Sequence, residues 1–517
     1  MSTSELECAF LIPYTVSLLV AGLPIFFMEL AFGQYASLGP VTIWKVAPLF
    51  QGTGYAMVVV SFLLGMYYNV LNGYSFFYMF HSFHWELPWS TCGNDWNSAA
   101  CSLSSNNCTA MNGTIYNGTC VTADDVGDDV FATLGKPKSP SEEYFQHRNT
   151  YTRTPVFHRQ SPCLSKMKRI LEGATSVWHF HATYFTALFP YFVLTVLLVR
   201  GVTLPGSGNG LMFYLYPKWE YLLTAKVWGD AAVQIFFDLS PCWGGLIALA
   251  SYNKFHNNCL RDALVVSFGN CLTSVYAGFA IFSLVGYMAY ELGVDVENVV
   301  AKGPGLAFIA YPAGLARLPG APIFAVLFFM MLLSLGLGTQ FTIVETVVTA
   351  VTDEYPKLFR KRKWLILGIV CIISYLVGLV FCTNTACTVL TSFDNYARTF
   401  ARYCPSRYRS NDSESHGFTG ADRFLENIAH MLGYDPWPRL FWKIIWKWAC
   451  PILLTVILIF TLYDFDTLKY GEYDYPSWAD GIGWVLSVIS ILFIPLIAVI
   501  AICKEEGSLL TSYGVAY

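Results

Sequence analysis

Long apolar runs separated by polar segments dominate the chain. Nine runs are long enough to cross a bilayer as helices, since about 20 apolar residues span the hydrocarbon core. They cover residues 10–32, 54–81, 182–200, 231–252, 263–290, 321–351, 364–383, 446–463 and 481–502. The pattern predicts an all-α polytopic membrane protein, built as a single membrane domain over residues 1–517.

The fourth run is interrupted in its middle by residues 238–245, with the sequence DLSPCWGG. A membrane helix must satisfy its backbone internally, so such a break is tolerated only inside protein or beside a hydrated cavity. Freed carbonyl groups and half-helix ends at that depth bind ions and small polar solutes. A carboxylate there is costly unless it is paired or hydrated, which gives Asp238 functional weight. The break therefore predicts a binding site near the middle of the membrane.

Composition agrees with a membrane protein and excludes several other classes. Hydrophobic residues make up 55% of the chain and charged residues only 13%, whereas soluble domains carry about 25% charged residues. The net charge of -4 does not point to nucleic acid. There is no zinc-type cysteine pair, phosphate loop, HExxH motif or Ser-His-Asp order, so we do not expect an enzyme. We also expect no cleavable signal peptide, because the first apolar run is too long and lacks a basic region.

A polar segment after the second run carries the marks of an extracellular loop. Asn107, Asn112 and Asn117 each begin a glycosylation sequon, and such sites are used in secreted or lumenal loops. Four cysteines suited to disulfides accompany them: Cys92, Cys101, Cys108 and Cys120. We therefore expect residues 84–180 to form an extracellular glycosylated loop continued by an atypical insert.

Basic residues mark the opposite side of the membrane. Lys and Arg cluster in residues 254–261, 357–363 and 398–423, which the positive-inside rule places in the cytoplasm. The chain must then cross the membrane within residues 121–177 and again within 385–397, but the first segment has no spanning run and the second is about half a span long. Two crossings are missing from the predicted topology.

Short motifs spread along the chain resemble those of one known family. They are AFLIPY (9–14), GLP (22–24), ExxxGQY (29–35), YYN (67–69), YFTA (184–187), RGVTLPG (200–206), SYNKF (251–255), GPGLAF (303–308) and YPxWA (475–479). The set resembles the neurotransmitter:sodium symporter family, also called sodium- and chloride-dependent transporters. The resemblance covers most of residues 9–120 and 183–503. Ser240 with WGG (243–245), and LGLGT (335–339), look most like glycine transporters.

The resemblance implies an inverted-repeat bundle of twelve spans whose first and sixth helices are broken. This sequence keeps about nine full spans of that pattern. Only residues 1–8 precede AFLIPY, so we expect the first span to be missing. Residues 148–177 stand in place of the fourth span, and the tenth stops after Ala397. The family pattern resumes at Ala421 after an atypical polar segment, residues 398–420. An incomplete gene model or splice form explains these departures most simply.

Two sodium sites are implied by the resemblance, and sodium prefers the hard oxygen ligands that a broken helix supplies. The first site draws on Asp238 and Asn270. The second draws on the Leu335 carbonyl and on positions 338 and 339. Position 338 is usually Asp in the family and is Gly338 here, so one ligand is lost. Thr339 can still offer a hydroxyl, although its alternative role is a hydrogen bond to its own helix.

A chloride site is implied by Tyr14, Gln234, Asn270 and Ser274, which are all present, together with a serine at position 238. Position 238 is Asp instead. A fixed carboxylate repels an anion at short range, but it can also supply the negative charge that chloride would bring. We hypothesise that Asp238 makes transport independent of chloride. The alternatives, a protonated Asp238 or an error in the sequence, stay open, and so does the need for chloride.

The substrate pocket implied by the resemblance uses Tyr68, Phe237, Ser240, Cys242 and Trp243. The Tyr68 hydroxyl would bind the substrate carboxylate, and Phe237 would act as a lid. Trp243 would fill space beside the α-carbon, which favours a small amino acid such as glycine. The alternative is that the aromatic residues only pack in the core.

Gates and a disulfide also follow from the resemblance. Asp394 matches the external gate carboxylate, and Asp353 and Tyr252 match the cytoplasmic gate. The arginine partners of both gates belong to the missing first span. Cys92 and Cys101 match the external-loop disulfide.

Two further acids, Glu29 and Glu345, lie inside apolar runs. An unpaired carboxylate is costly at that depth. We expect backbone groups inside the bundle to pair with both.

The resemblance implies a glycosylated plasma-membrane protein that couples sodium entry to amino acid or neurotransmitter transport by alternating access. Its expected partners are a small amino acid and the lipid bilayer, with no nucleic acid, and a homo-oligomer stays open. The alternative is a transport-inactive member, retained in the endoplasmic reticulum or acting as a membrane interaction partner.

Overall fold

The computed structural model describes residues 10–98, 101, 114–116, 119–121, 139–150, 176–216, 219–292, 295–299, 306–378, 420–463, 469–470, 473–474 and 477–504. Helices make up almost all of this part of the chain, which confirms the all-α prediction. The strands in the described residues form two short antiparallel hairpins. They pair β1 (Thr114–Tyr116) with β2 (Thr119–Val121) and β3 (Lys469–Tyr470) with β4 (Tyr473–Asp474).

Five helical segments of the described residues are long and apolar enough to cross a membrane. They are Leu11–Ala36, Pro48–His81, Tyr184–Val202, Cys259–Glu291 and Ala321–Glu354. The remaining predicted runs correspond to a broken pair of helices, α11 (Ala225–Leu239) and α12 (Gly245–Ala250), and to α18 (Lys363–Gly378), α23 (Cys450–Tyr463) and α24 (Ser477–Lys504). The chain is a multi-pass membrane protein.

The first predicted run folds as two helices joined by a π-helical turn. α1 (Leu11–Ser17) passes through η3 (Leu18–Gly22) into α2 (Leu23–Ala36). A Cβ on Gly22 would lie only 2.5 Å from Ile235 of α11, so glycine permits the close approach of the two segments. The first run is thereby packed directly against the outer half of the broken pair.

The other elements follow in chain order. They are η4 (Thr42–Val46), η5 (Pro48–Phe50), α3 (Gln51–His81), α7 (Pro140–Thr150), α9 (Ser176–Val202), α10 (Ser207–Leu215), η6 (Trp219–Leu223), α13 (Cys259–Leu292), α14 (Val296–Val299), η7 (Leu306–Ala310), α15 (Tyr311–Ala316), α16 (Ala321–Glu354), α17 (Pro356–Phe359), α21 (Gly420–Leu432), α22 (Arg439–Ile444) and η9 (Ile445–Ala449).

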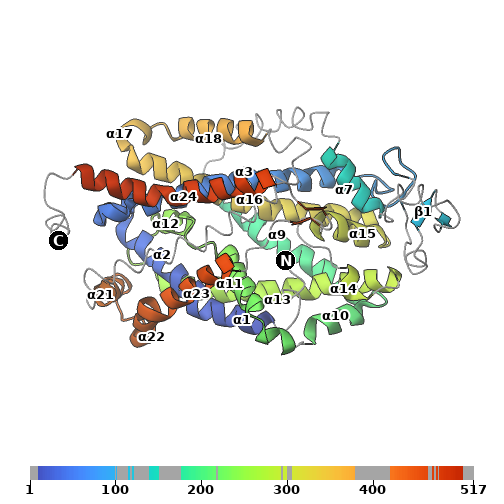
Figure 1. Ribbon diagram of the computed structural model, residues 1–517, viewed down its shortest axis with the longest axis horizontal. Helices are drawn as coiled ribbons and strands as arrows, with labels where there is room; N and C mark the ends of the chain where they lie inside the picture. Colours follow the sequence, from blue (N-terminus) through green and yellow to red (C-terminus); the bar gives the residue numbers. More distant parts are fainter. Residues whose placement is uncertain are drawn as a thin grey trace.

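The stretches predicted to lie on opposite sides of the membrane lie at opposite ends of the helical bundle. Figure 1 shows α7, α15 and β1, from the predicted external loops, gathered at one end. α17 and α21, from basic stretches predicted to be cytoplasmic, lie at the other end together with α22. The two largest apolar cores lie between them. One joins α1, α2, α3 and the broken pair to α21–α23, and the other joins the outer end of α3 to α7, α13, α15 and α16.

Candidate functional site

The predicted break is present between α11 and α12, and its backbone is left-handed at three positions. Ser240 has φ 50°, Cys242 has φ 66° and Gly244 has φ 77°. Residues other than glycine rarely adopt this conformation, which costs about 1–2 kcal/mol per residue. The surrounding structure must therefore hold the break in place.

Two side chains from neighbouring helices hold the break. The Glu29 carboxylate on α2 is 1% exposed and accepts a hydrogen bond of 2.6 Å from the Cys242 backbone N–H. The Ser61 hydroxyl on α3 donates to the Trp243 carbonyl. The expectation that Glu29 pairs with a backbone group is confirmed. Ser61 is a site residue that the sequence analysis missed, because a serine in an apolar helix gives no signal of its partner.

The inner half of the broken pair, α12, is fixed on α2. A Cβ on Gly33 would lie 2.5 Å from the Ile247 carbonyl oxygen, so the two backbones touch. The Gln34 amide then donates to the Phe255 carbonyl at 3.0 Å and to the Asn257 carbonyl at 2.7 Å. The ExxxGQY motif thus contacts the broken helix through Gly33 and binds the end of the SYNKF segment through Gln34.

The residues of the predicted chloride site gather around Asp238, and we call Tyr14, Gln234, Asp238 and Ser274 the Asp238 cluster. The Tyr14 hydroxyl and the Gln234 amide each donate to an Asp238 oxygen at 2.8 Å. The Ser274 hydroxyl lies within hydrogen-bonding reach of Tyr14. Asn270 lies one helical turn before Ser274 on α13. Its buried amide nitrogen has no hydrogen-bond partner among the described residues.

The second predicted sodium site is open by comparison, and we call Leu335, Gly338 and Thr339 the Thr339 cluster. The Leu335 side chain is 47% exposed, and a Cβ on Gly338 would meet no described atom within 4 Å. The Thr339 hydroxyl donates to the Leu335 carbonyl at 3.3 Å, which is the alternative considered from the sequence. The Tyr68 hydroxyl lies within hydrogen-bonding reach of Thr339, so one predicted pocket residue borders this cluster.

The aromatic pocket residues meet beside α3. The Phe237 and Trp243 rings form an edge-to-face pair with centroids 5.6 Å apart, and Ser240 donates to the Phe237 carbonyl at 3.2 Å. The buried Trp243 indole nitrogen has no hydrogen-bond partner among the described residues. Gln340 donates to the Gly65 carbonyl at 3.3 Å, one turn of α3 beyond Ser61. Gln340 is a second residue that the sequence analysis missed. Its signal in the sequence is an isolated amide side chain within an apolar helix.

The cytoplasmic gate residues take different partners. The Tyr252 hydroxyl donates to Glu345 at 2.9 Å and lies 2.8 Å from the Thr349 hydroxyl. The Asp353 carboxylate instead accepts from the Gly39 backbone N–H at 2.9 Å. The expected backbone pairing of Glu345 is wrong, because the segment after α12 brings the Tyr252 hydroxyl, and its own helix brings the Thr349 hydroxyl, within hydrogen-bonding distance of its carboxylate.

The structure confirms one predicted covalent link and leaves other predictions undescribed. Cys92 and Cys101 form a disulfide with Cα atoms 5.7 Å apart. The external gate residue Asp394, the sequons at Asn107, Asn112 and Asn117, and nearly all of residues 398–420 lie outside the described residues.

Comparison with known proteins gives a consistent result. The profile described as "Sodium:neurotransmitter symporter family" matches residues 6–158 and 163–505. The chain is 42% identical to "Sodium- and chloride-dependent glycine transporter 2" of Xenopus laevis over 525 residues, which cover 97% of the chain but 65% of that relative. It is 42% identical to glycine transporter 1 of Xenopus laevis, covering 96% of the chain and 79% of the relative. It is 40% identical to the neutral and basic amino acid transporter B(0+) of Homo sapiens, covering 97% of the chain and 81% of the relative.

Proposed function

Because the chain belongs to the sodium:neurotransmitter symporter family, we propose that it is a sodium-coupled symporter of a small neutral amino acid. The observation that carries the proposal is the break, where Ser240 and Cys242 are held in left-handed conformations by groups from other helices. Freed backbone groups of this kind bind ions and zwitterions in membrane transporters. The relatives named as glycine and neutral amino acid transporters favour the same substrate class.

The proposed substrate site lies between the broken pair, α3 and α16. Tyr68 on α3 would bind the substrate carboxylate, and the Phe237–Trp243 pair would limit the space beside the α-carbon. Trp243 is only 7% exposed and packs against a neighbouring ring, so little room is left for a large side chain. We infer that glycine or another very small amino acid is the substrate.

Sodium would enter as the co-transported ion through oxygen donors already in place. Asp238 and the side-chain oxygen of Asn270 suit a first site, and the Leu335 carbonyl with the Thr339 hydroxyl suits a second. Carboxylate, amide and carbonyl oxygens are the donors that hard cations prefer. The second site offers fewer side-chain oxygens, since Gly338 contributes none.

We further propose that Asp238 takes the role of chloride. Its two oxygens already accept hydrogen bonds from Tyr14 and Gln234 at 2.8 Å each, so the donors that an anion would require are engaged. A carboxylate at that place also repels a second anion in a low-dielectric site. Transport by this chain would then need sodium but no chloride.

A second candidate function is a transport-inactive membrane partner of other proteins. The exposed Leu335 and the 55% exposed Tyr252 favour it, because these two residues of the proposed ion site and gate are not enclosed by the described part of the chain. A stable second sodium site requires such residues to be shielded from lipid and bulk water.

Uptake of radiolabelled glycine by cells expressing this exact chain separates the two functions. Surface biotinylation measures in parallel how much protein reaches the plasma membrane. The symporter proposal predicts sodium-dependent uptake above that of untransfected cells. A chain that reaches the surface but shows no sodium-dependent uptake of glycine, alanine or serine would favour the inactive partner.

A further inference from the structure

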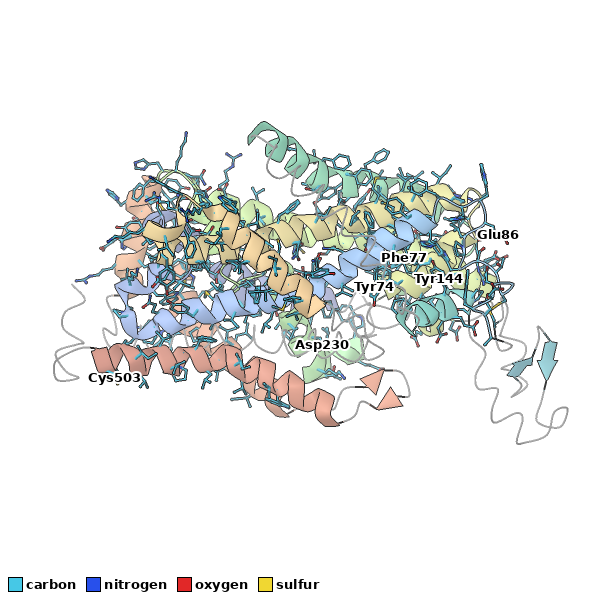
Figure 2. The ribbon with its side chains drawn as sticks, turned by 90° about the horizontal axis from the view of Figure 1, so that it is seen from above. Tyr74, Phe77, Glu86, Tyr144, Asp230 and Cys503 are labelled. Atoms are coloured by element: carbon cyan, nitrogen blue, oxygen red, sulfur yellow. A yellow bond between two sulfur atoms is a disulfide. The ribbon has the colours of Figure 1, made fainter. Side chains whose placement is uncertain are left out.

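The outer end of the molecule is closed by a segment that the sequence placed in an atypical insert. Residues 141–145 in the first turns of α7 are mostly buried, and Tyr144 is fully buried. Figure 2 shows Tyr144 beside Tyr74 and Phe77 of α3 at this end. Tyr144 is surrounded by the rings of Phe77, Tyr78, His81, Trp89 and Trp96. This part of the insert is therefore an integral part of the outer core.

A buried carboxylate binds α7 to the disulfide loop, by which we mean residues 89–98 and Cys101. Glu143 accepts hydrogen bonds from the Asn97 amide at 3.1 Å, from the Ser98 backbone N–H at 3.0 Å and from the Ser98 hydroxyl. Hydrogen bonds to a charged acceptor are stronger than those between neutral groups. Three donors on one carboxylate fix the orientation of α7 relative to the loop.

The Cys92–Cys101 disulfide positions those donors. Cys101 donates its backbone N–H to the Ser98 carbonyl at 3.1 Å, and the Asn97 amide lies 3.5 Å from the Cys101 sulfur. Asn97 also accepts from the Asn94 backbone N–H at 3.0 Å. Closing the loop with a covalent bond removes much of its conformational freedom. The disulfide therefore presents Asn97 and Ser98 to Glu143 as a preformed set.

Residues of α3, α7 and the disulfide loop also contact the external segment η7–α15. The Phe145 and Phe308 rings stack with centroids 6.1 Å apart and 6° between their planes. Tyr78 donates to the Phe308 carbonyl at 3.2 Å, and the Trp89 indole donates to the Pro312 carbonyl at 3.1 Å. Each contact joins η7 or α15 to α3, α7 or the disulfide loop.

The segment η7–α15 packs in turn against α16 and α13, which carry residues of the proposed site. Tyr311 packs against Phe328 of α16 with ring centroids 5.2 Å apart. A Cβ on Gly314 would lie 2.6 Å from the Met288 sulfur of α13. A displacement of η7–α15 would therefore be felt at the outer ends of α13 and α16, because packed interiors transmit strain.

We propose that residues 89–98, Cys101 and residues 139–145 form an outer latch that holds η7–α15 against α13 and α16, and that reduction of the Cys92–Cys101 disulfide releases it. The reductant is a small extracellular thiol. Two thiol molecules are oxidised to one disulfide while Cys92 and Cys101 each gain a hydrogen. The loop then loses its preformed shape, Glu143 loses its donors, and α7 no longer secures Phe308.

Hydrogen exchange on the purified full chain in lipid nanodiscs tests the latch. The variants are Glu143→Ala, Glu143→Gln, Cys92→Ser with Cys101→Ser, and the matched control Glu86→Ala, which removes an exposed carboxylate at the same end of the molecule. We expect Glu143→Ala and the double serine variant to exchange about tenfold faster than wild type in residues 306–316, since local opening sets that rate. Glu143→Gln should give a smaller increase because one acceptor oxygen remains, and Glu86→Ala should match wild type.

In a second arm of the hydrogen-exchange experiment, the protein is treated with a small thiol such as reduced glutathione. The thiol should speed exchange in residues 306–316 of wild type and leave the rate in the Glu143→Ala variant unchanged, because that latch is already open. Faster exchange confined to residues 91–101 and 139–150, with residues 306–316 unchanged, would overturn the proposal. So would a wild-type protein whose disulfide is shown by mass spectrometry to be reduced while its exchange pattern stays the same. Hydrogen exchange does not depend on transport. The result can therefore contradict the latch without contradicting the proposed transport function, and the reverse also holds.

Discussion

The Asp238 cluster and the Thr339 cluster are built on different helices and differ in how complete they are. Asp238 is bound by donors from α1 and from its own helix, and Ser274 of α13 stands within reach of Tyr14. Thr339 bonds back to its own helix, beside an exposed Leu335. A cluster built from several helices is preorganised, whereas one that satisfies itself locally needs a ligand or another segment to assemble it. We therefore expect the carboxylate at position 238 to remove the need for an anion and the second cation site to bind sodium weakly.

Removing Glu29 should have the largest effect, because Glu29 holds the backbone of the break itself. Glu29→Ala leaves the buried Cys242 N–H without its acceptor. Leaving a buried donor unsatisfied costs about 2 kcal/mol, which corresponds to roughly a thirtyfold loss of sodium-dependent glycine uptake. Glu29→Gln keeps an acceptor oxygen and should retain more activity. Equal uptake by wild type and Glu29→Ala, at matched surface expression, would show that the break does not depend on this contact.

Replacing Asp238 tests the complete cluster. Asp238→Ser restores the residue expected from the family and removes the fixed negative charge. Uptake by this variant should fall about tenfold when chloride is replaced by gluconate, because Tyr14 and Gln234 then lack an acceptor. Wild-type uptake should be the same in both salts. A wild-type chain that needs chloride as much as the variant does would contradict the assigned role of Asp238.

Replacing Thr339 tests the open cluster and should have the smallest effect. Thr339→Val removes a hydroxyl that is already bonded to the Leu335 carbonyl. We therefore expect only about a threefold loss of apparent sodium affinity, measured from the sodium dependence of uptake. Thr342→Val is the matched control, since Thr342 makes the same kind of bond to the Gly338 carbonyl one turn further along. A tenfold or greater loss specific to Thr339 would mean that the second sodium site is better formed than its open geometry indicates.

The sequence was sufficient to predict the helices, the position of the break and the residues that surround Asp238. These features follow from local patterns and from a family resemblance that extends along most of the chain. The partners of Glu29 and Glu345 look alike in sequence, since both are acids in apolar runs, yet one pairs with a backbone N–H and the other with hydroxyls. Such pairings join residues 213 and 93 positions apart, and only the packing of the helices decides them.

The outer end was the least predictable region. Residues 139–145 follow a polar segment and contain adjacent acids, which suggests an exposed insert. Their burial depends on a ring of aromatic side chains contributed by α3, the disulfide loop and η7, which are remote from one another in sequence. A single aromatic pair at positions 144 and 145 carries no local signal of that environment.

Transport by the purified full chain in proteoliposomes tests the central claim most directly. An imposed inward sodium gradient, with chloride present or replaced by gluconate on both sides, should drive accumulation of radiolabelled glycine to the same level in both salts. Accumulation that is the same with and without the sodium gradient would contradict the claim that the break carries a sodium-coupled amino acid site.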